Sequence, residues 1–315
     1  MLTTSPAFGI GVAIVVGVIG TSVIHLSKGI MKLGIMRMRE DKAPAAPLAA
    51  RVANAPNAAP ALAGRGRSIY IAGILMNFTN PLWVIIANRF APTVYYTSMY
   101  GLGLVSLLVF SRLILGEHLD RRRITGALIV VAGTLLIGAA RITSPASPLF
   151  LANRTTVLVI AGAWALAAPA IARLMRGAPI PAQELMFGLL GGGLAAMEAV
   201  LKGVSQSVDG AASFLPGAGP DWWIFAVSFL GAAGAFGMIQ WSYIRSCRVA
   251  IMAASYDVSY VALPLLVTAL AVSGERVNAL SVLGLVVLGT GAFFTQGASA
   301  SPSLERGEVV KDPGQ

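Results

Sequence analysis

Two carboxylates, Glu198 and Asp257, interrupt long apolar stretches of the sequence. An ionisable group at the centre of a membrane span costs about 2.5–3.5 kcal/mol on insertion scales, so such residues are candidates for function. Lys202 follows Glu198 by four residues, which favours an ion pair on one helix face, and a self-neutralised pair is the structural alternative to a binding role. Asp257 has no cation within one turn, only polar neighbours such as Tyr256 and Tyr260. We therefore expect Asp257 to meet a partner helix or to line a polar cavity.

The sequence NFTNP, residues 77–81, should break the helix that contains it. Pro81 has no amide hydrogen to donate to the carbonyl of Asn77, so the helix bends and backbone polar groups become available. Broken helices of this kind line sites in membrane carriers, whereas an inert kink satisfied by a neighbour is the alternative. The candidate binding residues are Asp257, Glu198, Asn77, Asn80, Tyr260, Tyr256 and His25.

Three basic side chains, His25, Lys28 and Lys202, also lie in apolar stretches. His25 is a candidate proton relay because imidazole titrates near neutral pH, and a hydrogen-bonded packing residue is the alternative. For the two lysines the simpler interpretation is snorkelling, in which the aliphatic stem is buried and the ammonium reaches the headgroups. A gate, or a contact to an anionic solute, is the other possibility for the lysines.

The composition is that of a membrane protein. Of the 315 residues 56% are hydrophobic and 11% are charged, whereas a soluble domain carries roughly 25% charged residues. The single cysteine, Cys247, excludes an intramolecular disulfide framework. The net charge of +10 comes largely from short loops between apolar runs, so we predict no nucleic-acid partner. With two histidines, one cysteine and no paired carboxylates at a membrane face, no catalytic set is visible, and we predict neither an enzyme nor a cofactor.

Apolar runs long enough to cross the hydrocarbon as helices occur nine times. Lys and Arg residues divide sixteen to four between the alternating loops, which places the N-terminus outside and the C-terminus in the cytoplasm of a cell membrane. Residues 37–67, rich in Ala and Pro toward their end, and the tail 298–315 are predicted to be disordered cytoplasmic segments. The nine runs are 7–30, 68–88, 92–114, 121–140, 156–174, 184–206, 222–244, 249–272 and 279–297.

A sequence repeat relates the two parts of the chain, 1–140 and 141–297. Four residues recur without a gap after 158 positions, and a Lys-Gly pair recurs after 174. Matched spans lie five helices apart, so the halves should cross the membrane in opposite senses as an inverted repeat, with spans 1–4 matching spans 6–9 and span 5 unpaired. We interpret the two glutamates of the repeat as charges that stabilise the starts of spans 4 and 9. The matched residues are Gly116, Glu117, Gly126 and Gly133 with Gly274, Glu275, Gly284 and Gly291, and Lys28-Gly29 with Lys202-Gly203.

The Gly-Glu turn followed by a glycine-bearing helix resembles the end of each half in the drug/metabolite transporter superfamily (EamA-like proteins). Within it, the nine-span layout and the segments IGTSVIHLSKG, GILMNF and FAP are similar to the NIPA magnesium-transporter family. The sequence departs from that family where SMYGLG stands in place of a Pro-Leu-Gly. The resemblance implies an all-α membrane protein of nine transmembrane helices that moves a solute by alternating access.

The resemblance also implies a divalent cation such as Mg²⁺ as a candidate solute. Carboxylate oxygens are suitable ligands for it, so Asp257 and Glu198 are the candidate metal ligands. The lysines offset these few acids, which leaves a small organic metabolite as the alternative solute and a non-transporting membrane scaffold as the alternative function. The expected partners are the lipid bilayer and the solute, and a homodimer stays open.

Overall fold

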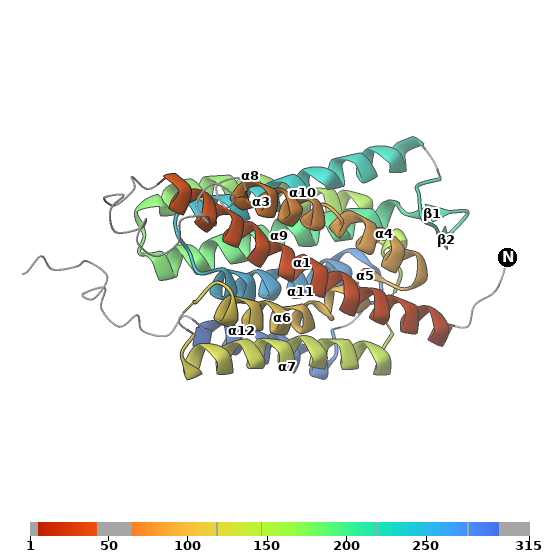
Figure 1. Ribbon diagram of the computed structural model, residues 1–315. Helices are drawn as coiled ribbons and strands as arrows, with labels where there is room; N and C mark the ends of the chain where they lie inside the picture. Colours follow the sequence, from red (N-terminus) through yellow and green to blue (C-terminus); the bar gives the residue numbers. More distant parts are fainter. Residues whose placement is uncertain are drawn as a thin grey trace, which may run out of the picture.

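The computed structural model describes residues 6–42, 65–117, 119–145, 147–217, 219–275 and 277–295, which form a bundle of helices (Figure 1). A short antiparallel hairpin between α9 and α10 is the one sheet in the described residues. The elements are α1 (Pro6–Lys42), α3 (Arg65–Asn77), α4 (Asn80–Phe90), α5 (Thr93–Thr97), α6 (Tyr100–Leu113), α7 (Arg121–Thr143), η1 (Leu149–Leu151), α8 (Arg154–Leu174), η2 (Met175–Gly177), α9 (Ile180–Ser205), β1 (Ser207–Val208), β2 (Ala211–Ala212), α10 (Gly219–Ile244), α11 (Val249–Ala271) and α12 (Ala279–Thr295).

The helices have the length and composition of membrane spans. In the described part of the chain, eight segments are long and apolar enough to cross a membrane. Large apolar side chains such as Leu166, Trp223 and Phe293 are at least 70% exposed on the outside of the bundle, where lipid would cover them. The ninth expected span is α12, whose 17 residues extend about 26 Å and fall short of the length of the others.

Two of the predicted spans are each divided into two helices. The second span consists of α3 and α4 with a break at residues 78–79, as the position of Pro81 predicts. The third consists of α5 and α6, and the sequence did not predict this second break. Both breaks leave polar side chains at helix ends inside the bundle, where Asn80 and Tyr100 are buried.

The predicted disordered segment 37–67 is wrong at both of its ends. Helix α1 continues to Lys42, and α3 already begins at Arg65. The added turns of α1 contain good helix formers. Arg39 donates hydrogen bonds to the carbonyl of Tyr243 in the last turn of α10 (3.3 Å) and to the hydroxyl of Ser246 just after that helix (3.2 Å). Residues 43–64 and the predicted tail 298–315 lie outside the described residues.

The helices that the sequence repeat matches pack within the bundle as follows. Helix α1 packs against α3, α4 and α6, while its repeat partner α9 packs against α10 and α11. Helices α7 and α12, which carry the repeated glycines, pack directly against each other. A Cβ atom placed on Gly126 would lie 2.8 Å from the carbonyl oxygen of Gly291, and one on Gly284 would lie 3.1 Å from that of Gly133. Only residues without side chains allow the two backbones to approach this closely.

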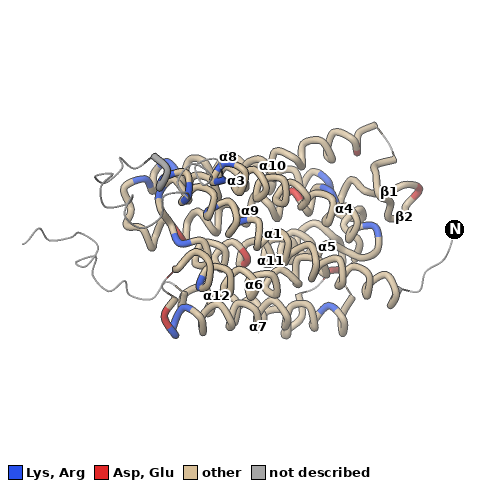
Figure 2. The backbone as a smooth tube through the Cα atoms, in the orientation of Figure 1, with Lys and Arg blue, Asp and Glu red and all other residues tan. Residues whose placement is uncertain are grey.

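Charged residues divide unevenly between the two ends of the bundle (Figure 2). Lys and Arg gather at the end that holds the turns before α7 and before α11, opposite the labelled N-terminus. We call this the basic end, and we call the other the N-terminal end, where α4 and α9 finish beside the β1–β2 hairpin. The distribution follows the loop asymmetry of the sequence.

Candidate functional site

Charged and aromatic side chains from both halves of the chain meet inside the bundle, and we call this group the central polar cluster. Helices α1, α4 and α6 with the short α5 contribute from the first half, and α9 and α11 contribute from the second. Every side chain in the group is at most 7% exposed. The members are His25, Lys28, Asn80, Tyr96, Tyr100, Glu198, Lys202, Tyr256, Asp257 and Tyr260.

His25 of α1 and Asp257 of α11 form a buried pair. The Nε2 atom of His25 lies 3.1 and 3.2 Å from the two carboxylate oxygens of Asp257. The Nδ1 atom lies 2.8 Å from the carbonyl oxygen of Thr21, which only accepts, so Nδ1 must carry a hydrogen. The contact to Asp257 then needs a second proton, either on Nε2 or on the carboxyl group. The pair therefore holds one proton between two helices from opposite halves, and it supplies the helix partner predicted for Asp257.

Asn80 occupies the break in the second span and connects several members of the cluster. Its side-chain oxygen accepts hydrogen bonds from the hydroxyls of Tyr96 and Tyr100, both at 3.3 Å. Its amide nitrogen makes a longer contact, 3.5 Å, to Glu198. The break thus does more than bend the span, because it places a side chain with both donors and acceptors beside the buried charges.

Glu198 and Lys202 of α9 form the ion pair that their spacing predicts, with 2.5 Å between the carboxylate and the ammonium. The ammonium also lies 4.1 Å from the centre of the Phe229 ring. The snorkelling interpretation of Lys202 is wrong, because its side chain is fully buried. The attraction of Glu198 one turn earlier, inside a tightly packed helix, holds the ammonium in place.

The snorkelling interpretation is also wrong for Lys28, whose side chain is fully buried. Among the described residues its ammonium has no hydrogen-bond partner. It lies over the ring of Tyr256, 3.7 Å from the ring centre, and 5.5 Å from the centre of the Tyr100 ring. The charge of Asp257 also acts on it. Ring faces and a nearby carboxylate attract this ammonium, but its three hydrogens have no acceptor.

The tyrosines form the wall of the cluster. Tyr100 packs on Tyr260 with 3.9 Å between ring centres and lies edge-on to His25 at 5.1 Å. Tyr256 and Tyr260 stack at 5.8 Å. Tyr256 and Tyr260 were predicted as binding residues from the sequence, whereas Tyr96 and Tyr100 were not. The three tyrosines at positions 95, 96 and 100, at the start of the predicted span 92–114, were the available signal.

Asn77, the remaining predicted binding residue, lies at the margin of the cluster. Its side-chain oxygen is 3.4 Å from the hydroxyl of Ser27. Together with Asn80, Glu198 and Tyr256 it lines a cavity of about 30 Å³, enough for about one or two water molecules. A second cavity of about 130 Å³ lies near the N-terminal end, lined by residues that include Asn88, Thr93, Leu149, Gly203 and Gln206.

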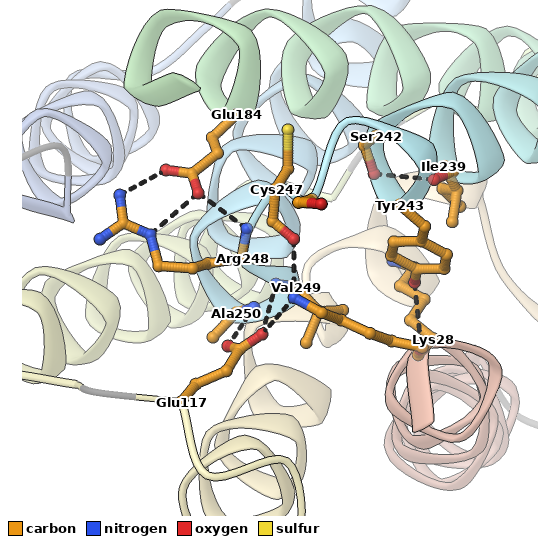
Figure 3. Close-up of polar contacts among 12 residues, drawn as sticks. Lys28, Glu117, Glu184, Ile239, Ser242, Tyr243, Cys247, Arg248, Val249 and Ala250 are labelled. Carbon is orange, nitrogen blue, oxygen red and sulfur yellow. Dashed lines mark hydrogen bonds and ion pairs between the residues drawn. The ribbon is translucent and has the colours of Figure 1, made fainter. Parts of the chain in front are cut away.

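Four charged residues form two ion pairs at the basic end, one within each half, and we call Lys32, Glu117, Glu184 and Arg248 the basic-end layer. Figure 3 shows Glu117, Glu184 and Arg248 of this layer. Glu117 accepts from the Lys32 ammonium at 2.8 Å and from the backbone amide of Val249 at 2.9 Å. Glu184 accepts from three nitrogens of Arg248, at 2.7 to 2.9 Å. The contact between Glu117 and Val249 ties the turn before α7 to the start of α11 across the two halves. The Glu184–Arg248 pair joins α9 to α11 within the second half.

The predicted role of the repeat glutamates needs correction. Glu117 stabilises the start of α11, not of α7, which Asp120 caps. Glu275 accepts from Arg141 at 2.6 Å and from the amide of Ser147 at 3.1 Å, while Asn278 accepts from Ser281 at the start of α12. The Gly-Glu turns carry each carboxylate away from its own helix, since Gly116 and Gly274 have positive φ angles of 64° and 82°.

Cys247 lies next to the basic-end layer, directly before Arg248. Its carbonyl oxygen accepts from Lys32 at 2.7 Å. Its side chain is fully buried. Burial, together with the negative charge of Glu184, raises the pKa of the Cys247 thiol to about 12. The thiol therefore stays protonated and unreactive at neutral pH.

The candidate metal ligands already have partners, since Asp257 contacts His25 and Glu198 contacts Lys202. In the part of the chain that the structure describes, no group of three or more His, Cys, Asp or Glu side chains is placed to hold a metal ion. Comparison with family models, with curated proteins and with solved structures finds no match to this chain.

Proposed function

We propose that this integral membrane protein is a carrier of the drug/metabolite transporter type that moves a small organic solute by alternating access. The observation that supports it most is the central polar cluster. Lys28, Glu198, Lys202 and Asp257 are at most 1% exposed within long apolar helices. Burying such groups in a membrane span is costly, and proteins that retain them generally use them to bind or conduct.

The two ends of the bundle differ in a way that supports a carrier. At the N-terminal end, the cavity of about 130 Å³ reaches Gly203, the residue after Lys202. At the basic end, Glu117 accepts from the backbone amide of Val249 and Lys32 donates to the carbonyl of Cys247, and these contacts join the halves. A carrier closed at one end would have this arrangement, and opening the other way would require these hydrogen bonds to break. The Lys32–Glu117 and Glu184–Arg248 ion pairs each lie within one half and could move with it. The positive-inside rule would make the basic end cytoplasmic.

An organic solute fits the cluster better than Mg²⁺. A divalent cation needs several oxygen ligands, and Mg²⁺ gives up its waters reluctantly. Here each carboxylate is already engaged, by His25 and by Lys202, and the Lys28 ammonium would repel a metal ion beside Asp257. The tyrosine walls instead offer ring faces and hydroxyls to an organic molecule.

Purified full-length protein in liposomes tests the proposal. We expect counterflow of at least one labelled solute from a panel of organic acids, amines and amino acids, with no response of a fluorescent Mg²⁺ dye trapped inside. A response of the Mg²⁺ dye without counterflow of any organic solute would show that the solute is Mg²⁺ and not an organic molecule. If neither moves, and the Asp257→Asn protein behaves as the unaltered chain does, the carrier proposal fails and a scaffold is the better description.

A further inference from the structure

The Lys28 ammonium is a buried cation with no hydrogen-bond acceptor among the described residues. We propose that it receives the carboxylate group of the solute, and that the rings of Tyr100 and Tyr256 pack against the body of that solute. This inference rests on the proposed function and narrows the solute to an organic carboxylate.

The charges of the cluster support an anion. The His25–Asp257 pair holds one proton and is neutral overall, whether the proton is on the imidazole or on the carboxyl group. Glu198 and Lys202 neutralise each other at 2.5 Å. Lys28 is therefore the charged member of the cluster that forms no ion pair among the described residues, since the Asp257 carboxylate that attracts it is already paired with His25. One bound carboxylate would make the whole cluster neutral.

The hydrogen bonds lead to the same conclusion. An ammonium has three donors, and a buried donor without an acceptor is unfavourable. Lys202, its partner in the sequence repeat, donates to Glu198. The position four residues before Lys28 is occupied by Ile24, which has no acceptor in its side chain. Both halves thus have a lysine at the matched position, but only Lys202 has a carboxylate four residues before it.

An organic cation is the alternative that the same walls would suit, since tyrosine rings beside a carboxylate attract ammonium groups. However, the face of Tyr256 already has an ammonium 3.7 Å from its centre, that of Lys28. A cationic solute would have to displace Lys28 and leave two positive charges in one buried place. A carboxylate can instead approach Lys28 where it lies.

The solute has to enter by movement of the helices. The cavity of about 30 Å³ that is lined by Asn80, Glu198 and Tyr256 is too small for an organic acid. A closed cluster between two halves agrees with a carrier in which the site opens to one end at a time. The solute would be bound where α1 and α11 meet.

Three probes that share one ring separate the alternatives: benzoate, benzamide and benzylamine are an anion, a neutral molecule and a cation. With the full-length protein in detergent, we expect benzoate to raise the thermal unfolding temperature and the other two to have little effect. In liposomes, labelled benzoate should show counterflow. Stabilisation by benzylamine but not by benzoate would establish a cation site, and equal effects of benzoate and benzamide would show that the charge is not recognised. Either result overturns the proposal.

Two substitutions of Lys28 test whether its ammonium binds the carboxylate of benzoate. Lys28→Met keeps the length of the side chain without its charge and should weaken benzoate binding by about tenfold or more, because a hydrogen bond to a charged group is lost. Lys28→Arg should keep much of the binding. If Lys28→Met does not fold, the comparison of the three probes on the unaltered chain still decides.

The competing cation, Lys202, is tested by the double variant with Glu198→Gln and Lys202→Met, in which overall affinity and transport should fall because both residues belong to the central polar cluster. In this double variant the preference for benzoate over benzamide should remain, since Lys28 is unchanged. If the preference for benzoate over benzamide is lost in the double variant but kept in Lys28→Met, the carboxylate binds at Lys202. That result would overturn the assignment of the carboxylate to Lys28. If no carboxylate binds or moves while an amine shows counterflow, the carboxylate inference fails and the carrier proposal stands.

Discussion

Gly126 of α7 and Gly291 of α12 touch through their backbones, so that a Cβ atom on either would lie within 2.8 Å of the other's carbonyl oxygen. In the sequence repeat Gly126 corresponds to Gly284 and Gly133 to Gly291. In space Gly126 meets Gly291, and Gly133 meets Gly284. This crossed pairing is what antiparallel packing of α7 and α12 produces, while the inverted repeat of the whole chain stays a prediction.

Replacing Gly126 by alanine should loosen this contact. The added methyl group would lie 2.7 Å from the backbone nitrogen of Thr295, so one helix has to move, and we expect a loss of about 1–3 kcal/mol in stability. Gly162, in α8, is the control because a Cβ atom there meets nothing within 4 Å. Gly162→Ala should be neutral or slightly stabilising. Thermal unfolding in detergent measures both variants, and equal unfolding temperatures would contradict the close contact.

Asp257→Asn should abolish or strongly reduce transport, by about tenfold or more, while leaving the protein in the membrane. The amide keeps the shape of the carboxylate but removes the group that shares a proton with His25. Asp209→Asn is the control, since Asp209 is exposed in the β1–β2 turn with φ 51°, a conformation that asparagine tolerates. Counterflow in liposomes is the measurement, and normal uptake by Asp257→Asn would remove this residue from the site.

Glu117 and Lys32 should be strongly coupled. Their side chains are 7% and 13% exposed, and Glu117 also accepts from the amide of Val249. Glu117→Gln should cost about 1–3 kcal/mol, because Lys32 and the start of α11 lose a charged acceptor. A double-mutant cycle with Lys32→Met should give a coupling energy of about 0.5–3 kcal/mol. Strictly additive effects would mean that the ion pair between Lys32 and Glu117 contributes nothing to the stability of the first half.

Cys247 provides a probe of the basic end because the chain has one cysteine. At neutral pH we expect slow labelling of the native protein by a maleimide and fast labelling after denaturation. Glu117→Gln should speed up native labelling if this layer closes the bundle. Rapid labelling of the unaltered protein would contradict the buried, protonated thiol.

The raised pKa of Cys247 should also make the stability of the folded chain depend on pH. The thiol pKa is about 12 in the folded chain, against a usual value near 9. Between these values the unfolded chain releases the proton first, so stability should fall as the pH rises above about 9. Cys247→Ser should reduce this alkaline loss, and the comparison of unfolding temperatures across the pH range measures it. An unchanged pH profile would contradict the shift.

The sequence predicted the helices of the bundle well because each is a long apolar run bounded by charge or proline. The bounds of the eighth run, 249–272, nearly equal those of α11, Val249–Ala271. Pro81 likewise predicted the break before α4, since a missing amide hydrogen acts locally. The spacing of Glu198 and Lys202 predicted their ion pair for the same reason.

The remaining features depend on contacts between distant segments. Glu117 accepts from the amide of Val249, which is 132 residues away in the sequence. The position of Glu117 just before α7 therefore led to the wrong prediction that it stabilises the start of that helix. The burial of Lys28 depends on ring faces from α6 and α11. The β1–β2 hairpin, by contrast, was available from the sequence, because Asp209-Gly210 is a strong signal for a tight turn.

The cap that Glu117 provides for α11 has a consequence for biogenesis. The ribosome makes Glu117 well before Val249, and at about 5–20 residues per second the carboxylate waits for roughly ten seconds. During that time Lys32 is the partner that is already present. The first half must therefore be inserted with this carboxylate held by one lysine, and the contact is completed only after α11 arrives. A nascent chain arrested before residue 249 would lack the contact between Glu117 and Val249. Crosslinking between the turn before α7 and the start of α11, in chains stalled at increasing lengths, would show when the bundle assembles.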